Sequence, residues 1–492
     1  MNFSELNNKL NAYSLALTTM SFDAQTIAPK MGDAYRNNVM SFLSGEYFSL
    51  FTSHEAYVAL TDALLSEDPI IAKSAAQMLE SLNKIKDIPY DEYVAFENLK
   101  LASHNVWADS RKNKDYSTFV ENLNELITSH RNVISYRPNG ASIYDASLDD
   151  YEKGLTINIV DNFFTTVNDK IVPFIDKVIE HQEPRPSFMS AFVSISKQRE
   201  ISELVMTHLG YCIDFGLLGE AEHPFSSTFS INDTRITTTY HENDFTQSIF
   251  SIIHEIGHSM YNHQVNPEFE GYAIADSMSM SLHESQSRFL ENMIGRSAAF
   301  WTPLYPKLQA IIPDVLGGVS LDEFIRGINF VERGAIRIEA DELTYPLHIL
   351  VRYNIEKLMF VEAHDAHGLD QKFADEMTRI LKLTPASVSD GILQDIHWSD
   401  ASFGYFPTYA LGTAYAAQFM AAMEKNLDVE QTLLDGNLSL IFDWLRQNIH
   451  QFGGSIETQD LILKVCGEAF DPNYYVNYLI TKYSTLVGIP FE

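Results

Sequence analysis

The chain has 492 residues, of which 45% are hydrophobic and 20% charged, a balance typical of a globular protein that excludes disorder as the main state. Acidic side chains outnumber basic ones by 66 to 34, and the formal net charge of -32 disfavours nucleic acid and anionic lipid as partners because such a surface repels phosphate. The two cysteines, Cys212 and Cys466, are too few for a disulfide framework and favour a reducing compartment.

The N-terminal sequence has no basic region followed by an apolar stretch, so we predict no signal peptide. No apolar run approaches the roughly 20 residues that a bilayer-spanning helix needs. We therefore expect a soluble cytoplasmic protein that binds neither membrane nor nucleic acid.

Most of the chain is predicted to be helical, because apolar residues recur at three- and four-residue spacing with few Gly or Pro between them. Residues 60–85 and 160–178 are two clear examples. The breaks between such stretches are short, as in EPRPS near residue 185 and NPEFEG near residue 268. Since none resembles a flexible linker, we expect a single domain over residues 1–492.

Residues 228–240, TFSINDTRITTTY, are the main exception to the helical pattern. They are rich in Thr, Ile and Phe, with Asn232-Asp233 in the middle as a turn signal. The segment therefore predicts a short strand or hairpin, which ends about fourteen residues before the motif described next.

The run His254-Glu255-Ile256-Gly257-His258 predicts a metal site. On a helix, residues four apart lie one above the other, so the two imidazoles can reach one ion with Glu255 beside it. Zinc with an open position lowers the pKa of bound water to about 7, and a neighbouring carboxylate can take that water's proton. The flanking apolar residues form a helical stripe: Ile249, Ile252, Ile253, Ile256 and Met260.

Gly257 stands in the interior of this predicted helix. A glycine there costs about 1 kcal/mol relative to alanine. We therefore expect another element to approach the helix closely at Gly257, where a side chain would not fit.

A catalytic zinc ion needs a third protein ligand, and Glu284 in SLHESQSRFLENMIG is the best candidate. This second helix follows the first after a turn at Asn266-Pro267, and an antiparallel pair would bring Glu284 near His254. His283 and His263 are weaker alternatives, because each turns away from the required helix face.

Seven separated runs, in order, resemble the carboxypeptidase Taq family of zinc metallocarboxypeptidases. They are HPF (223–225), DTRIT (233–237), HEIGH (254–258), HESQSR (283–288), IRIEADELTYPLHI (336–349), GILQDIHW (391–398) and FGYFPTYALG (403–412). The N-terminal run SFDAQTIAPKMGDAYR is a weaker match.

The resemblance implies a mainly α fold, with a large saddle-shaped helical subunit, a deep central groove and a small β-ribbon beside the zinc helix. A helical part of about residues 1–215 would cover one side of the groove, and about residues 216–492 would be catalytic. The family removes single amino acids from the free C-terminus of peptides, uses Zn²⁺ with Co²⁺ accepted by some members, and usually forms homodimers. His254, His258 and Glu284 match the family's metal ligands, and Glu255 matches its general base.

A carboxypeptidase must bind a terminal carboxylate, which suits the planar fork of arginine. Arg337 is our first candidate because it lies in a family run. Arg235 and Arg352 are weaker ones, and Arg235 is as well suited to ordering the predicted strand. His223 is expected to line the groove, and the strand edge is expected to pair with the substrate backbone.

A tyrosine or histidine donor near the metal would stabilise the developing oxyanion. Tyr409 is preferred, with Tyr405 and His397 as alternatives. We expect Gln394 and Asp395 to orient His397 or to hold the peptide.

Three other functions compete with this prediction. The first is a zinc endopeptidase or oligopeptidase of the gluzincin type, which would need no carboxylate clamp; an aminopeptidase is disfavoured because the chain has no Gly-x-Met-Glu-Asn run. The second is a non-catalytic zinc-binding protein. The third is a purely structural zinc site, which would usually have four protein ligands, often cysteines.

Overall fold

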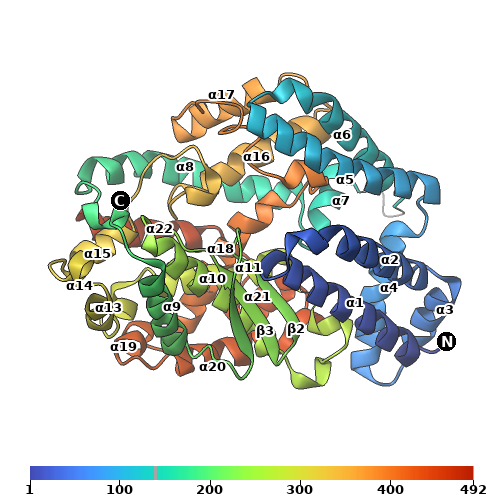
Figure 1. Cartoon of the computed structure of the whole chain (residues 1–492), viewed down its shortest axis with the longest axis horizontal. Coiled ribbons are helices and arrows are strands. Elements are labelled where there is room, and N and C mark those ends of the chain that lie inside the picture. The colour runs from blue at the N-terminus through green and yellow to red at the C-terminus, as the bar shows by residue number, and fades with distance from the viewer. Residues whose placement is uncertain (138–140, 277, 491–492) are drawn as a thin grey trace. The chain divides into compact units, whose positions relative to one another are not determined.

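A computed structural model describes residues 1–137, 141–276 and 278–490 of the chain (Figure 1). Within these ranges helices predominate, and three short strands form one sheet. The predicted mainly α fold with a small β element is therefore confirmed. The saddle shape and the central groove remain predictions. No helix in the described ranges is both long and apolar enough to cross a bilayer.

The chain divides into two compact units, and each is assembled from three separate stretches. Unit 1 comprises Met1–Lys86, Arg185–Ile328 and Gln418–Ala469, and unit 2 comprises Asp87–Pro184, Asn329–Ala417 and Phe470–Glu492. That the whole chain acts as one peptidase domain, with a catalytic part from about residue 216, remains a prediction.

Unit 1 contains the N-terminal helices, the sheet and the helices that follow the sheet. Its helices are α1 (Phe3–Thr26), η1 (Lys30–Gly32), α2 (Asp33–Phe51), α3 (His54–Ala63), α4 (Pro69–Ile85), η3 (Ser187–Ser190), α9 (Ile195–Leu209), α10 (Phe245–His263), η4 (Pro267–Phe269), η5 (Ala273–Ala275), α11 (Met280–Arg288), the π-helical η6 (Phe289–Ile294), α12 (Ala298–Trp301), α13 (Tyr305–Ile311), α14 (Pro313–Leu316), α15 (Leu321–Ile328), α19 (Val429–Leu434), α20 (Ser439–Asn448), η9 (His450–Ser455) and α21 (Thr458–Cys466).

The regular elements of unit 2 are all helices within its described residues. Its helices are α5 (Tyr90–Asn113), η2 (Tyr116–Thr118), α6 (Val120–Ser135), α7 (Ile143–Asp149), α8 (Ile157–His181), η7 (Arg337–Glu339), α16 (Tyr345–Phe360), α17 (Leu369–Leu381), η8 (His397–Asp400) and α22 (Asn473–Val487). Helix α18 (Phe406–Glu424) begins in unit 2 and ends in unit 1. The predicted helix at 160–178 is confirmed as α8, whereas the stretch 60–85 is split between α3 and α4.

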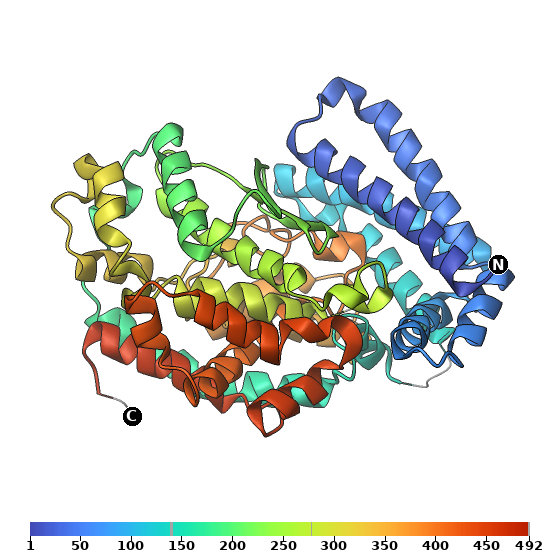
Figure 2. The same ribbon diagram turned by 90° about the horizontal axis from the view of Figure 1, so that it is seen from below.

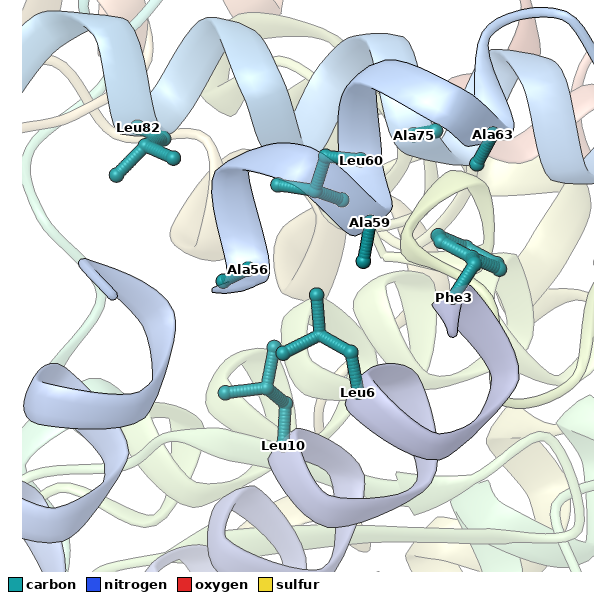
Figure 3. Close-up of a cluster of buried hydrophobic side chains, with 9 residues drawn as sticks. All are labelled: Phe3, Leu6, Leu10, Ala56, Ala59, Leu60, Ala63, Ala75 and Leu82. Atoms are coloured by element: carbon teal, nitrogen blue, oxygen red, sulfur yellow. The ribbon is translucent and has the colours of Figure 1, made fainter. Parts of the chain in front are cut away.

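Helices α1, α3 and α4 of unit 1 form a small apolar core (Figure 3). Helix α3 presents three alanines to α1 and α4, and these small side chains allow the helices to approach closely. At the start of α1, the side chain of Asn2 accepts from the backbone of Glu5 while Glu5 accepts from the backbone of Asn2, which satisfies two free helix N–H groups. Burial of the apolar stripes and this cap together explain why the segment is helical.

Helix α2 contributes no buried residue to this core. It pairs with α1 as a long helical hairpin, drawn in dark blue in Figure 2, and leaves large apolar side chains in solvent. Met31 just before α2 is 101% exposed, and Tyr35 and Phe42 on α2 are 79% and 66% exposed. An apolar surface of this kind is unusual on a monomer and is typical of an interaction surface.

The sheet has the strand order β1-β3-β2, with β1 (Gly216–Glu220) parallel and β2 (Ser226–Ser230) antiparallel to β3 (Asp233–Thr238). The predicted hairpin is confirmed as β2 and β3. Strand β1 was not predicted, because GLLGE has two glycines and no alternation of polar and apolar residues.

Strand β3 packs on α10, which lies beside it in Figure 1. Two hydroxyl pairs join them: Thr234 to Ser259 at 2.5 Å and Thr238 to Ser251 at 2.7 Å. The sheet therefore fixes one side of the helix that carries the metal-site motif.

Candidate metal centre

Helix α10 carries His254, Glu255 and His258. It begins after Asp244, whose side chain accepts from the backbone N–H of Gln247 and caps the helix. The predicted apolar stripe is buried as expected. The imidazole centroids of His254 and His258 are 4.9 Å apart, so the four-residue spacing places both rings on one side of the helix.

Helix α11 packs against α10 at Gly257. A Cβ atom at this position would lie 2.5 Å from the carbonyl oxygen of Gln286 and 2.5 Å from Cα of Ser287, both backbone atoms of α11. The prediction that a second element approaches closely at Gly257 is confirmed. The same close approach brings Glu284 of α11 within reach of the two histidines.

His450 also ties α10 to α11. Its Nδ1 is 2.7 Å from the side-chain amide of Gln264, directly after α10, and its Nε2 is 2.8 Å from that of Gln286 on α11. Both partner atoms are amide oxygens, which accept hydrogen bonds. Burial lowers the pKa of His450 to about 3, so the ring is neutral near pH 7 and its single N–H donates to one of them.

His254, His258 and Glu284 form the one group of three or more metal-ligating side chains found among the described residues. Their ligand atoms lie within 4.8 Å of one another. Oε2 of Glu284 is 3.6 Å from Nε2 of His254 and 3.4 Å from Nε2 of His258. Ligands at about 2.0–2.1 Å in a tetrahedron would be separated by roughly 3.3–3.4 Å, so the three residues fit a zinc-sized ion.

The charge state of Glu284 also suits a metal ligand. Burial alone would raise its pKa, but Arg288 and the two histidines hold the pKa well below its usual range. Arg288 donates from Nε to Oε1 at 2.7 Å, which leaves Oε2 directed at the imidazoles. The carboxylate is therefore ionised and oriented.

Glu255 is 6% exposed and is not a member of the ligand group. Burial raises its pKa, although the two histidines counteract part of the increase. A carboxyl whose pKa is raised toward neutrality is a stronger base than an exposed one, as proton transfer in catalysis requires.

The two alternative third ligands have other partners. Nε2 of His283 is 3.2 Å from Oδ1 of Asn262, and its ring stacks on His258 with a centroid separation of 4.5 Å. Nδ1 of His263 is 2.7 Å from the carbonyl oxygen of Ile231, and its ring stacks on Phe215. Neither belongs to the ligand group.

Glu291, which the sequence did not single out, contacts a ligand directly. Its Oε2 is 2.9 Å from Nδ1 of His254 and accepts from Nη1 of Arg288 at 3.1 Å, while Oε1 accepts from Nη2 of Arg296 at 3.3 Å. Arg288 thus bridges Glu284 and Glu291. The spacing of four and then three residues from Glu284 to Arg288 and Glu291 was the available signal, because it places all three on one helix face.

In unit 2, Arg337, Arg352 and Asp395 form a second charged group, which we call the arginine cluster. Oδ1 of Asp395 accepts from Nε of Arg337 at 2.9 Å, and Oδ2 accepts from Nε of Arg352 at 2.6 Å. Burial would raise the pKa of Asp395, but the two guanidinium groups hold it well below its usual range. The buried cluster therefore carries two positive charges and one negative charge.

The arginine cluster is extended by polar and aromatic side chains. Nη1 of Arg337 donates to the hydroxyl of Tyr345 at 3.0 Å, and its guanidinium lies over the ring of Tyr409, 4.9 Å from the centroid. Gln394 accepts from the backbone N–H of Arg337 at 2.8 Å. Gln394 also donates to the backbone carbonyls of Ala335 and Asp390. That Gln394 and Asp395 orient His397 or hold the peptide remains a prediction.

The predicted oxyanion donors lie together in unit 2. Nε2 of His397 is 3.2 Å from the hydroxyl of Tyr409, and the ring of Tyr405 stacks on His397 with a centroid separation of 5.4 Å. Burial lowers the pKa of His397 to about 4, so this ring is neutral near pH 7.

Arg235 and His223 lie in or beside the sheet of unit 1. Arg235 on β3 makes a two-point ion pair with Asp233 of the same strand, at 2.8 and 2.7 Å, and lies over the ring of Phe229. This geometry favours the strand-ordering role that the sequence left open. His223 is exposed in the connection between β1 and β2.

Comparisons with known proteins show the family of the chain. The family profile described as carboxypeptidase Taq (M32) metallopeptidase matches residues 2–483. The chain is 38% identical to carboxypeptidase 1 of Bacillus subtilis, with 98% of each chain covered, and 31% identical to thermostable carboxypeptidase 1 of Thermus thermophilus, with 97% covered. The crystal structure of an M32 carboxypeptidase from Deinococcus radiodurans matches with a TM-score of 0.95 at 29% identity over 99% of each chain.

Proposed function

The chain belongs to the carboxypeptidase Taq (M32) family of metallopeptidases and is therefore a metallocarboxypeptidase, and from this premise we propose that His254, His258 and Glu284 hold a catalytic zinc ion while Glu255 is the general base. The observation that supports this assignment best is the spacing of the three donor atoms. The buried carboxyl of Glu255 lies next to His254 in the chain and is not one of these donors. The donor set of two imidazoles and one carboxylate also accommodates cobalt.

When bound, the metal supplies Lewis acidity, which polarises the scissile carbonyl and lowers the pKa of water in its open position. Glu255 accepts a proton from the attacking water as the oxygen adds to the carbonyl carbon. As the C–N bond breaks, Glu255 delivers that proton to the nitrogen of the departing amino acid. Its raised pKa suits both steps, because the group must take up and release a proton near neutral pH.

Arg337 is proposed to bind the C-terminal carboxylate of the substrate. Its Nε and Nη1 are engaged by Asp395 and Tyr345, which fixes the plane of the guanidinium. A fixed guanidinium can offer a remaining edge to a second carboxylate without losing further side-chain freedom. The excess positive charge of the arginine cluster supports an anionic ligand.

Tyr409 is proposed as the oxyanion donor, with His397 orienting its hydroxyl through their 3.2 Å contact and Tyr405 packing against that histidine. His223 and Arg235 are proposed to contact the substrate near the sheet. Strand β2, at an edge of the sheet, has the geometry to pair with an extended peptide, which would read the backbone and not the side chains.

The proposed substrates are short unstructured peptides with a free C-terminus. The protein is proposed to act in the cytoplasm as a homodimer. Both cysteines are free, which fits a reducing compartment. The exposed apolar side chains of α2, among them Tyr35 and Phe42, offer a surface that a second copy could cover.

The test is to incubate zinc-loaded protein with an N-blocked peptide and to follow the products by mass spectrometry. We expect stepwise loss of single C-terminal residues that stops with a chelator and returns with zinc. Glu255→Gln should reduce the rate by roughly 10²- to 10⁴-fold while zinc content stays near that of the unchanged protein. Glu268→Gln, at an exposed acid on η4, is the matched control and should keep full activity.

Three outcomes would contradict the proposal. Internal cleavage of the peptide would replace carboxypeptidase action by endopeptidase action. Full activity of Glu255→Gln would remove Glu255 as the base. Bound zinc without turnover of any peptide in a broad library would indicate a binding protein.

A further inference from the structure

Glu291 contacts Nδ1 of His254, whereas Glu284 faces the other ring nitrogen, Nε2. The Nδ1–Oε2 distance is 2.9 Å, and the contact is shielded, because Glu291 is 8% exposed. A carboxylate can only accept a hydrogen bond, so Nδ1 must carry the proton. The lone pair of the neutral ring then resides on Nε2, the atom that lies 3.6 Å from Glu284.

The charge on Glu291 is secured by two arginines from its own segment. Arg288 donates to Oε2 at 3.1 Å and Arg296 donates to Oε1 at 3.3 Å, so each oxygen of the carboxylate is paired with a guanidinium group. Arg296 is itself held, because its guanidinium lies over the ring of Phe250 and donates to the carbonyl of Ile328. The carboxylate is therefore a fixed, ionised acceptor.

The second histidine ligand lacks such a partner. Nδ1 of His258 is buried and has no hydrogen-bond acceptor among the described residues. Its ring is instead held by stacking on His283, whose Nε2 is 3.2 Å from Asn262. Of the two imidazoles, only His254 has its tautomer fixed by a neighbouring charge.

We propose that Glu291 is a positioning residue that fixes the tautomer and plane of His254 and raises the basicity of its Nε2 toward the metal. This inference rests on the proposed metal centre. A carboxylate behind a ligating histidine orients the ring and strengthens its donation to the ion, and loss of such a partner typically costs 10- to 100-fold in metal affinity.

The experiment compares zinc affinity, measured by competition with a chromophoric chelator, in two variants that separate orientation from charge. Glu291→Gln keeps an oxygen that can accept from Nδ1 but removes the charge. Glu291→Ala removes both. We expect affinity to fall in the order unchanged protein, Gln variant, Ala variant, with a total loss of about 10- to 100-fold.

Glu342→Gln and Glu342→Ala are the matched controls. Glu342 is a buried carboxylate, 6% exposed, that accepts from Lys482 at 2.5 Å and from the hydroxyl of Tyr483 at 3.4 Å and lies outside the ligand group. Its replacement should lower thermal stability in the same way as replacement of Glu291 and leave zinc affinity unchanged. In cobalt-loaded protein, the visible absorption bands should shift in the Glu291 variants and stay constant in the Glu342 variants.

Unchanged zinc affinity in folded Glu291→Ala would overturn the inference and leave Glu291 a structural residue. If neither Glu291 variant folds, Glu291→Asp retains the charge for Arg288 and Arg296 while withdrawing the oxygen from Nδ1, and it must also lose affinity. Zinc affinity that survives His254→Ala would overturn the proposed metal centre itself, whatever the Glu291 variants do.

Discussion

The metal centre of unit 1 and the arginine cluster of unit 2 are both buried and charged, but they differ in how their charges balance. Around the metal centre, Glu284 and Glu291 are matched by Arg288 and Arg296, which leaves Nε2 of each imidazole and one oxygen of Glu284 for a cation. The arginine cluster sets two guanidinium groups against Asp395 alone.

An uncompensated buried charge costs several kcal/mol, so a cluster that retains one indicates the sign of its missing partner. The excess positive charge of the arginine cluster points to an anion, such as a peptide carboxylate. In the metal centre Glu284 and Glu291 are paired with arginines, and the groups left over are the carboxyl of Glu255 and the lone pairs of Glu284 and the two imidazoles. The comparison teaches that the balance of charge distinguishes an anion site from a cation site where burial alone does not.

Arg337→Gln is expected to have the largest effect on activity, and its outcome tests whether the arginine cluster binds an anion. Loss of a charged hydrogen bond to the substrate should lower kcat/KM by roughly 10- to 150-fold on peptides with a free C-terminus, because such bonds contribute about 1.5–3 kcal/mol. Peptides with an amidated C-terminus should lose little, and zinc affinity should stay constant. Steady-state kinetics on the paired substrates provide the measurement.

Arg379→Gln serves as the control for Arg337→Gln, since Arg379 is exposed and is paired with Glu376 on its own helix α17. If Arg337→Gln slows both substrates equally, the arginine cluster is structural and the assignment to a carboxylate is wrong.

Gly257→Ala should have an intermediate effect, on stability and on zinc affinity. It changes the metal centre and leaves the arginine cluster unchanged. The new Cβ would meet backbone atoms of α11 at 2.5 Å, and relief of this overlap must separate α11 from α10. Overpacking of this kind costs about 1–3 kcal/mol of stability, and zinc affinity should fall because Glu284 moves with α11. Denaturant unfolding and chelator competition report the two quantities.

Gly45→Ala is the matched control, because Gly45 lies inside α2 with nothing within 4 Å of its would-be Cβ. It should raise stability by about 0.5–1 kcal/mol. A Gly257→Ala variant that gains stability in the same way would show that the helices are not in contact there.

Near neutral pH the smallest effect is expected from His348→Leu beside the arginine cluster, because its pH-dependent contribution appears only in acid. Burial, together with Arg352 and Arg337, lowers the pKa of His348 to about 3, and Asp395 opposes the shift. Below pH 6.5 the unfolded chain takes up a proton at His348 that the folded chain does not. Stability from this group is therefore present above pH 6.5 and is lost as the pH falls toward 3.

Replacement of His348 should make the free energy of unfolding less steeply dependent on pH, by about 1.4 kcal/mol per pH unit between pH 6 and 4. Urea midpoints measured across that range test this expectation. An unchanged slope would mean that His348 is protonated in the folded protein.

The sequence predicted the elements that depend on short-range patterns. The apolar stripe placed His254 and His258 on one helix, and Gly257 indicated the close approach of α11 that brings Glu284 to them. Both predictions succeed because helical spacing converts directly into position on a helix face.

Features that depend on distant partners were not predicted. Strand β1 is stabilised by pairing with β3, and its own residues show no strand pattern. Asp395 lies beside His397 in the chain, yet its oxygens meet Arg337 and Arg352 from other elements. Pairings of this kind are decided by the packing of the chain and leave no local signature.

The link between His450, Gln264 and Gln286 has a consequence for biosynthesis. His450 follows Gln264 by 186 residues and Gln286 by 164 residues, whereas all three proposed metal ligands precede residue 285. A ribosome thus releases both ligand-bearing helices long before the imidazole that ties them together. In the growing polypeptide, the metal centre gains its full set of supports only when translation nears the end of the message.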